Sequence, residues 1–140
     1  MPFQIGTCRS ISDDAVRWVG TVATVLAVDD SPSMRMLVET TLKQHGHQVI
    51  LAQDGAEALA AARQAELDLV LTDVNMPNMN GIQLVSELRK IERFRFTPIL
   101  MLTTEGSNEK KQEGRKAGAT GWITKPFDPE KLISTVDKVL

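Results

Sequence analysis

The fold is decided by one stretch of the sequence, LVLTDVNMPNMNG at residues 69–81. Its four leading residues are apolar or β-branched, and Asp73 follows them directly. A short apolar run bounded by Pro and Asn-Gly is typical of a strand buried on both faces of a parallel sheet. Asp73 is then expected at the carboxyl end of that strand, the edge at which open α/β sheets bind ligands. The alternative, an aspartate that merely begins a turn, loses weight because other strands of the chain end in the same way.

Three further apolar segments stop on polar residues. These are 24–28 before Asp29 and Asp30, 98–102 before Thr103, and 122–124 before Lys125. One more strand is expected at 48–52, where the sequence reads QVILA. Each run is too short for a typical helix and is bounded by turn residues, so all four are interpreted as strands.

Helix signals separate the strands. Ser31 and Asp128 are each followed by proline, the pattern of an N-cap and a first helical residue. Asp54-Gly55 leads into an Ala-rich helix, and Arg89 suits the last turn of another helix because cations are favoured there. Helices are expected at 32–45, 55–64, 81–90, 108–117 and 129–140. Five alternating strands and helices predict an α/β fold, a doubly wound five-stranded parallel sheet with helices on both faces.

Composition narrows the classes of function. The chain has 140 residues, 42% of them hydrophobic, and a net charge of −2, so it has material for one core and no strong overall field for nucleic acid or an anionic membrane. Its single cysteine cannot form an internal disulfide, which fits a reducing compartment. No apolar run approaches the roughly 20 residues of a membrane span. These features predict a cytoplasmic protein with neither nucleic acid nor membrane as a partner.

A parallel sheet brings the carboxyl ends of its strands to one edge, which would collect Asp29, Asp30, Asp73, Thr103 and Lys125. Gathered carboxylates repel one another unless a cation or a proton intervenes, and hard oxygen ligands suit Mg²⁺. A lysine and a hydroxyl supply the charge and the hydrogen-bond donor that a phosphoryl group needs. An aspartate can itself be the nucleophile and form an acyl phosphate. The set therefore predicts a phosphoryl-accepting site.

Four motifs carry a resemblance to a known family: VDDS at 28–31, DVNMP at 73–77, TTE at 103–105 and KPF at 125–127. In this order and spacing they resemble the receiver domain of two-component response regulators, from about Val22 to Leu140. Within that family the chain is most similar to single-domain chemotaxis regulators of the CheY type. The resemblance implies a flavodoxin-like sheet with strand order 2-1-3-4-5.

The resemblance also implies a magnesium site and its ligands. Asp73 would be the phosphoacceptor. Mg²⁺ would be held by Asp30, Asp73 and the backbone carbonyl of Asn75, with Asp29 acting mainly through a metal-bound water.

A switch is implied in the same way. Lys125 would pair with the phosphoryl oxygens, Thr103 would swing to hydrogen-bond one of them, and the aromatic residue of the fifth strand, Trp122, would move inward. Family members more commonly have Tyr or Phe there, so Trp122 would need more room. The resemblance further implies a cis Lys125-Pro126 bond, and Thr104 is expected to narrow access to Asp73.

The implied function is a phosphorylation-activated switch rather than an enzyme, with only slow self-catalysed phosphorylation and dephosphorylation. A CheA-like histidine kinase would donate the phosphoryl group, and a flagellar motor switch protein would bind the activated monomer. The alternative is a receiver that acts as a phosphate relay or sink outside chemotaxis. A haloacid-dehalogenase-like phosphatase would need a second aspartate where Asn75 stands, and a nucleotide-binding module would need a phosphate cradle that the glycines of 114–121 do not match.

Two groups of residues carry weaker signals. His45 falls on the helical spacing of 32–45, and His47 follows the Gly46 stop, so neither is expected to bind a metal. Basic residues in the helix at 108–117 make a face interpreted as solvated surface, with partner binding as the alternative: Lys110, Lys111, Arg115 and Lys116.

Residues 1–21 have no motif and are expected to form an extension outside the domain of residues 22–140. We hypothesise that the native protein starts at Val22, which leads directly into the first strand. Mass analysis of protein from its own host that found residues 1–21 intact would contradict this hypothesis.

Overall fold

The computed structural model describes residues 23–103, 108–125 and 127–140. The predictions about residues 1–21, about a start at Val22, about Thr104 and about the Lys125-Pro126 bond therefore lie outside the described residues, and they stay predictions.

The sheet is the predicted one. Its five strands are all parallel and lie in the order β2-β1-β3-β4-β5. The strands are β1 Thr24–Val28, β2 Gln48–Ala52, β3 Leu69–Asp73, β4 Ile99–Thr103 and β5 Gly121–Thr124. In the register of the central strands, Val28 pairs with Thr72 and Asp73 pairs with Leu102. The ends of β1, β3 and β4 are thus level with one another, and the residues that follow them meet at one edge of the sheet.

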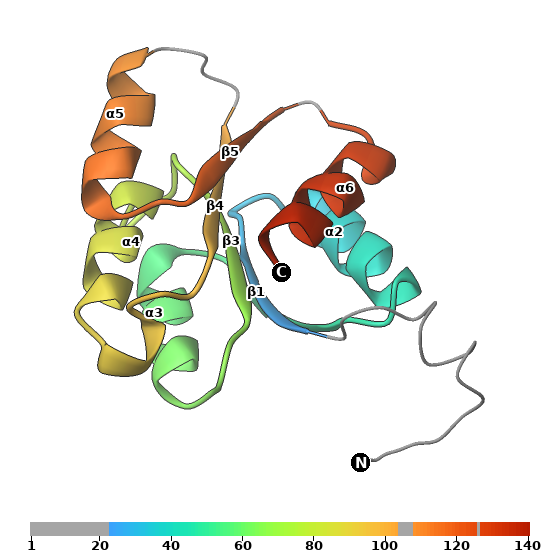
Figure 1. Ribbon diagram of the computed structural model, residues 1–140, viewed down its shortest axis with the longest axis horizontal. Coiled ribbons are helices and arrows are strands. Elements are labelled where there is room, and N and C mark those ends of the chain that lie inside the picture. Colours follow the sequence, from blue (N-terminus) through green and yellow to red (C-terminus); the bar gives the residue numbers. More distant parts are fainter. Residues whose placement is uncertain (1–22, 104–107, 126) are drawn as a thin grey trace.

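Helices cover both faces, as predicted. The helices are α2 Pro32–Gln44, α3 Gly55–Arg63, α4 Gly81–Arg89, α5 Asn108–Ala117 and α6 Pro129–Val139. Figure 1 shows α3, α4 and α5 on one face of the sheet and α2 with α6 on the other. A short 3₁₀ helix, η1 Glu92–Phe94, follows α4 and was not predicted. The predicted flavodoxin-like architecture is confirmed.

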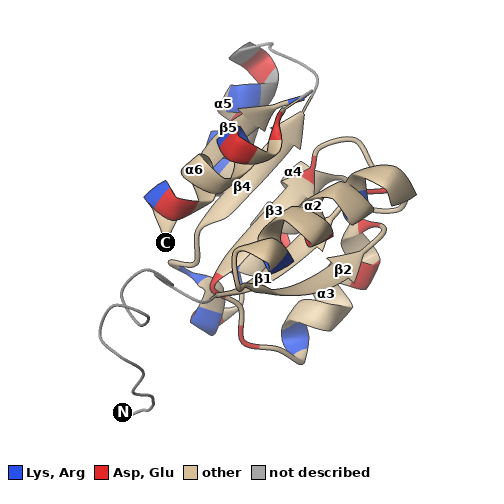
Figure 2. Ribbon diagram, turned by 90° about the vertical axis from the view of Figure 1, so that its right-hand side faces the viewer, with Lys and Arg blue, Asp and Glu red and all other residues tan. Residues whose placement is uncertain are grey.

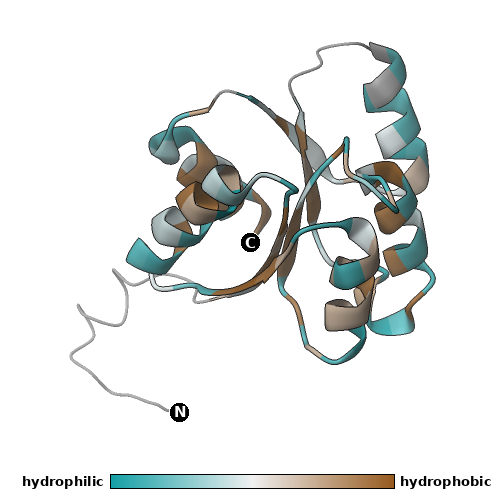
Figure 3. Cartoon of the chain, turned by 180° about the vertical axis from the view of Figure 1, so that it is seen from behind, coloured by the Kyte–Doolittle hydropathy of each residue, from teal (hydrophilic) through white to brown (hydrophobic). Residues whose placement is uncertain are grey.

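The core has two halves, one on each face of the sheet. Every residue of β3 and β4 is buried, which explains why their sequences are continuously apolar instead of alternating. Leu26 and Val70 belong to the half under α3, α4 and α5, whereas Ala27 and Leu71 belong to the half under α2 and α6. Figure 3 shows hydrophobic residues along the strands and in helices on both faces of the sheet, whereas α5 is mostly hydrophilic. The sheet therefore separates two packed layers.

Side-chain caps fix where the helices begin. Ser31, Asp54, Asn80 and Asp128 each accept a hydrogen bond from a backbone N–H in the first turn of α2, α3, α4 and α6. At α4 the cap is a capping box, because Gln83 also accepts from the Asn80 N–H. Each such cap stabilises its helix by about 1 kcal/mol. Two of these caps, Ser31 and Asp128, lie close behind the ends of β1 and β5, next to the site residues Asp29, Asp30 and Lys125.

The two histidines differ from the sequence-based expectation. His45 ends α2 as an exposed C-cap, whereas His47 is 6% exposed and its Nδ1 accepts the backbone N–H of Ala23 at 3.1 Å. Gly46 between them has a φ of +87°, and this turn sends the chain back toward the sheet. The helix expected at 32–45 ends one residue earlier, at Gln44. The turn at Gly46, and not the helix, decides which histidine is buried.

Charges are dispersed over the described surface. On α5, Arg115 and Lys116 are exposed, but so are Glu109 and Glu113. Figure 2 shows basic and acidic positions interspersed along the helices. Among the described residues, no helix has the length and apolar character needed to cross a membrane.

Candidate functional site

Three carboxylates meet at the carboxyl edge of the sheet. Asp29 and Asp30 follow β1, and Asp73 is the last residue of β3. One carboxylate oxygen from each residue lies within 4.8 Å of the other two. Asp29 and Asp73 are buried, and Asp30 is exposed. The structure thus brings together the three predicted carboxylates, with one of them open to solvent.

Lys125 places its ammonium group between two of these carboxylates. Its Nζ lies 2.8 Å from Oδ2 of Asp29 and 3.4 Å from Oδ2 of Asp73. The backbone N–H of Lys125 donates to the carbonyl of Thr103 at 2.8 Å, which ties the residue after β5 to the end of β4. Only 12% of the Lys125 side chain is exposed. This ammonium group is therefore the positive charge that balances the buried carboxylates.

The Asp29 side chain is held by two donors. Oδ1 accepts the backbone N–H of Ser31 at 2.9 Å, while Oδ2 is engaged by Lys125. The Asp29 carbonyl also accepts from Nη1 of Arg35 at 2.6 Å, which fastens the end of β1 to α2. Because each oxygen of Asp29 already has a protein donor, the exposed Asp30 is the better candidate for direct cation contact of the two residues that follow β1.

Asp73 lies in a balance of opposing influences. Burial raises the pKa of its carboxyl above the usual value, the Lys125 ammonium group lowers it, and the Asp29 carboxylate raises it again. The backbone N–H of Val74 donates to Oδ1 at 2.8 Å and favours the ionised form. Burial dominates, so the pKa is raised overall. A cation beside Asp73 would favour the carboxylate, the form in which an aspartate acts as a nucleophile.

The loop after Asp73 is fastened at its far end. The Gly81 N–H donates to the carbonyl of Val74 at 2.9 Å, and a Cβ at Gly81 would collide with the backbone carbonyl of Asp73. The first residue of α4 therefore has to be glycine, because α4 begins directly against the backbone of Asp73.

The middle of this loop is tied to α3. Asn78 has a positive φ of 69°, a conformation that Asn tolerates better than most residues. Its Nδ2 donates to Oδ2 of Asp54 at 2.9 Å, and a Cβ at Gly55 would lie 2.5 Å from the carbonyl of Met79. The loop thus packs closely on the start of α3. Asn75, the expected carbonyl ligand, is exposed near the beginning of this anchored loop.

Thr103 and Trp122 lie on the same face of the sheet. Thr103 ends β4 and is 2% exposed. Met101, two residues earlier on β4, pairs with Trp122 in the parallel register and belongs to the core half under α3, α4 and α5. Trp122 is half-buried and packs against the same half. The two predicted switch residues therefore share one layer of the protein.

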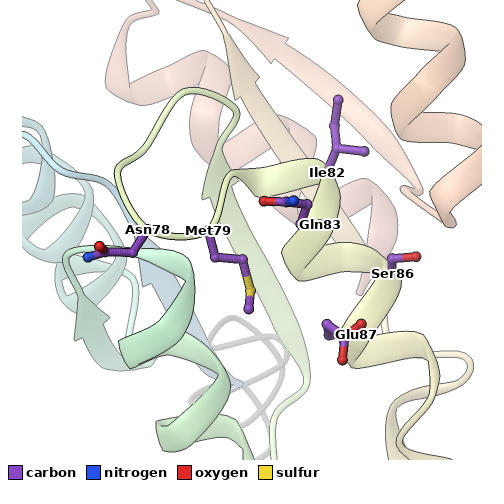
Figure 4. A pocket seen from close by; sticks show the side chains of 6 residues that line it. All are labelled: Asn78, Met79, Ile82, Gln83, Ser86 and Glu87. Atoms are coloured by element: carbon purple, nitrogen blue, oxygen red, sulfur yellow. The ribbon is translucent and has the colours of Figure 1, made fainter.

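A hollow of about 380 Å³ lies beside α4 but contains none of the carboxylates. It is lined by residues of the loop and of the first turns of α4: Asn78, Met79, Ile82, Gln83, Ser86 and Glu87. Figure 4 shows Asn78 at one side of this hollow, next to the helix that Asp54 caps. The chemistry is concentrated at the strand ends and not in this hollow.

Several residues that support the site were not predicted from the sequence. Arg35 and Asn78 were not singled out, although each makes a hydrogen bond that positions the end of a strand or a loop. The only local signal was an arginine in the helix that follows two aspartates, and an asparagine in a Pro-Asn-containing loop. Gly114 was seen only as part of a glycine-containing segment, and its contact with Trp122 is described below.

Comparisons with known proteins agree with this geometry. The model of the family described as "Response regulator receiver domain" matches residues 25–137. The chain is 39% identical over 119 residues to protein PilH of Pseudomonas aeruginosa, covering 85% of this chain and 98% of that protein. It is 40% identical over 118 residues to chemotaxis protein CheY1 of Helicobacter pylori, covering 83% of this chain and 95% of that protein.

Solved structures share the fold. The chemotaxis response regulator CheY4 of Vibrio cholerae is similar with 55% identity and a TM-score of 0.83, over 86% of this chain and 100% of that chain. The receiver domain of sensor histidine kinase PA1611 from Pseudomonas aeruginosa is similar with 27% identity and a TM-score of 0.78, over 84% and 97% of the two chains. That structure has a magnesium ion coordinated in its active-site cleft.

Proposed function

The chain belongs to the family of response regulator receiver domains, and from this premise we propose that it is a phosphorylation-activated switch with Asp73 as its phosphoacceptor. The observation that carries the proposal is the Lys125 ammonium group, which lies 2.8 Å from Asp29 and 3.4 Å from Asp73 at the carboxyl edge of the sheet. An ammonium group in this position can pair with the Asp73 carboxylate before transfer and with an oxygen of the phosphoryl group afterwards. Two-component signalling is the setting in which such receivers act.

The donor set fits Mg²⁺. Three carboxylates with oxygens within 4.8 Å offer hard ligands, and Mg²⁺ characteristically binds one or two carboxylates plus phosphate oxygens. The residues that would hold it are Asp30, Asp73 and the carbonyl of Asn75, with Asp29 contacting metal-bound water. Bound there, Mg²⁺ supplies charge neutralisation for the phosphoryl oxygens. The magnesium ion in the similar PA1611 receiver supports this assignment.

In the transfer step, an oxygen of the Asp73 carboxylate attacks the phosphorus atom of a phosphohistidine on the kinase. The Asp73 O–P bond forms as the histidine N–P bond breaks, and the imidazole keeps the bonding electrons. Lys125 then neutralises a phosphoryl oxygen, since its Nζ is already beside Oδ2 of Asp73. The Thr103 hydroxyl hydrogen-bonds another oxygen, and Trp122 responds on the same face of the sheet. Self-catalysed phosphorylation and dephosphorylation are slow, and the protein turns over no other substrate.

We place the output in chemotaxis, with a CheA-like kinase as donor and a flagellar motor switch protein as partner of a cytoplasmic monomer. Support comes from the similarity to CheY4 and CheY1, both named as chemotaxis proteins. PilH, at nearly the same identity as CheY1, is not named as a chemotaxis protein, which leaves a second candidate, a receiver that relays or drains phosphoryl groups elsewhere. A binding measurement with a motor switch protein from the same host distinguishes the two candidates: binding of the phosphorylated chain would favour the chemotaxis output, and lack of binding would favour the relay or sink.

The experiment that tests the phosphoacceptor is intact mass spectrometry after incubation with acetyl phosphate, with and without Mg²⁺. The wild type should gain one phosphoryl group only with Mg²⁺, and Asp73→Asn should gain none. The matched control is Asp68→Asn, because Asp68 lies just before the opposite end of β3, where its carboxylate accepts the Thr24 N–H. A mass gain in Asp73→Asn equal to that of the wild type would contradict the assignment.

A further inference from the structure

A buried glycine lies in the middle of α5, directly against the ring of Trp122. Gly114 is the seventh residue of this ten-residue helix, a position where glycine costs up to about 1 kcal/mol relative to alanine. A Cβ built on Gly114 would lie 2.7 Å from both Cη2 and Cζ2 of Trp122. Since real Cβ atoms do not approach carbon so closely, the tryptophan fills the space that an alanine methyl group would need.

The backbone conformation of Gly114 gives no other reason for a glycine. Among the described residues, the glycines with positive φ are Gly46 and Gly118, and Gly114 has ordinary helical geometry. The next nearest neighbour of the built Cβ is the Cβ of Ala119, at an unstrained 3.9 Å. The contact with Trp122 is therefore what excludes a side chain at this position.

Gly114 is also where α5 is joined to the segment that leads into β5. Its carbonyl accepts the N–H of Gly118 at 3.1 Å and the N–H of Ala119 at 2.9 Å. Trp122 follows three residues after Ala119, so the ring folds back onto the helix turn to which its own strand is tied. A movement of the ring away from Gly114 would change the packing between β5 and α5.

We propose that Gly114 is the positioning residue of the switch: it leaves a gap in α5 that holds the six-membered ring of Trp122 in the resting position. The ring leaves this gap when Thr103, on the same face of the sheet, responds to the phosphoryl group on Asp73. The wide gap explains how a tryptophan takes a position that Tyr or Phe occupies in other receivers. The movement of the ring on phosphorylation rests on the proposed function. The gap at Gly114 is a property of the unphosphorylated protein and does not depend on that function.

The gap is tested by a double-mutant cycle that requires no phosphorylation. Urea unfolding followed by circular dichroism would be compared for the wild type, Gly114→Ala, Trp122→Phe and the double variant. Phe lacks the two ring atoms that face Gly114. We expect Gly114→Ala to lower the midpoint in the wild-type background and to raise it in the Trp122→Phe background, where the usual helix preference for alanine is restored.

Three outcomes of the cycle are decisive. If Gly114→Ala fails to fold but the double variant folds, the gap is supported. If the effects of the two substitutions add, or if the double variant also fails to fold, Gly114 is needed for a reason other than the ring and the proposal is wrong.

The coupling is tested by fluorescence in the Trp18→Phe background, where Trp122 is the remaining one of the chain's two tryptophans. We expect acetyl phosphate with Mg²⁺ to change the Trp122 emission, and Gly114→Ala to shift the emission in the same direction before any donor is added. Because displacement of the ring and phosphorylation favour the same state, Gly114→Ala should also raise the ratio of phosphorylated to unphosphorylated protein at equal donor concentration, by about fivefold or more. Intact mass separates the two ideas. No mass gain in the wild type would refute the proposed function, whereas a mass gain with identical emission changes in both proteins would refute the coupling.

Discussion

At the scale of single residues, burial assigns different roles to neighbouring residues of the same type. Asp29 and Asp30 are adjacent, but one is buried between Ser31 and Lys125 and the other is exposed. His45 and His47 differ in the same way, since only His47 is buried. Near the end of a strand or helix, residues close in sequence can point in different directions. A change of one position in the chain therefore decides which side chain is buried and which is exposed.

The pH dependence of the free energy of unfolding should show the contribution of the buried His47 ring. Burial lowers its pKa below the usual value, so the folded state favours the neutral ring. A depressed folded pKa gives stability that is present above the unfolded pKa of about 6.5 and is lost as pH falls. Protonation would also remove the acceptor for the Ala23 N–H.

We therefore expect His47→Gln to flatten the decline in the free energy of unfolding as pH falls below about 6.5. Urea unfolding across that range measures it, with His45→Gln as the control because His45 is exposed. An identical decline in His47→Gln and the wild type would contradict this role.

At the scale of elements, the loop between β3 and α4 depends on a helix that is distant in sequence. The hydrogen bond between Asn78 and Asp54 joins this loop to the cap of α3. The pKa of Asp54 is lowered, chiefly by the backbone N–H of Glu57 and then by Asn78. One aspartate thus begins a helix and holds the loop that carries Asn75.

Loss of this tether should weaken Mg²⁺ binding. We expect Asn78→Ala to lower the Mg²⁺ affinity measured by calorimetry by about two- to tenfold, because the hydrogen bond to Asp54 positions the loop that carries Asn75. Gln83→Ala is the matched control: it removes the hydrogen bond of the capping box on the same loop but not the tether to α3. Equal affinities for Asn78→Ala and the wild type would show that the loop holds its position without Asp54.

Much of the element scale was predictable. The strands and the helix caps followed from short apolar runs and from Ser31-Pro32, Asp54-Gly55 and Asp128-Pro129, since these signals are local. The 3₁₀ helix η1 was not, because its sequence ERF has no local signal of that kind. The candidate site was largely predictable because a parallel sheet gathers strand ends. The Asn78–Asp54 and Gly114–Trp122 contacts were not, because each joins residues that only the tertiary fold brings together.

At the scale of the whole molecule, one arginine joins segments from distant parts of the chain. Arg89 lies in the last turn of α4, as expected. Its guanidinium group also donates to carbonyls at the end of η1, in the residues after η1 and in the α5–β5 connection: Phe94 at 2.7 Å, Thr97 at 2.6 Å, Arg95 at 3.2 Å and Gly118 at 2.7 Å. Burial lowers its pKa, and the planar group satisfies several carbonyls at once. Arg89 therefore holds together the base of the layer formed by α4 and α5.

Arg89→Lys should destabilise the protein by roughly 1–3 kcal/mol, because a lysine cannot reach all of these carbonyls and leaves partly buried acceptors unpaired. Thermal or urea unfolding measures the loss. Arg95→Lys is the matched control, since the Arg95 side chain is 53% exposed. Equal stability of the two variants would show that the Arg89 network contributes little.

The sheet also separates the proposed switch residues from the layer of α2 and α6. Thr103, Trp122 and Gly114 all belong with the layer of α3, α4 and α5, whereas α2 and α6 pack on the opposite face against separate core residues. We therefore expect a dye or a fused reporter attached at Lys138, an exposed residue of α6, to leave phosphorylation and the Trp122 response unchanged. The same division makes α6 the place to anchor the protein to a surface when its signalling is to be watched one molecule at a time.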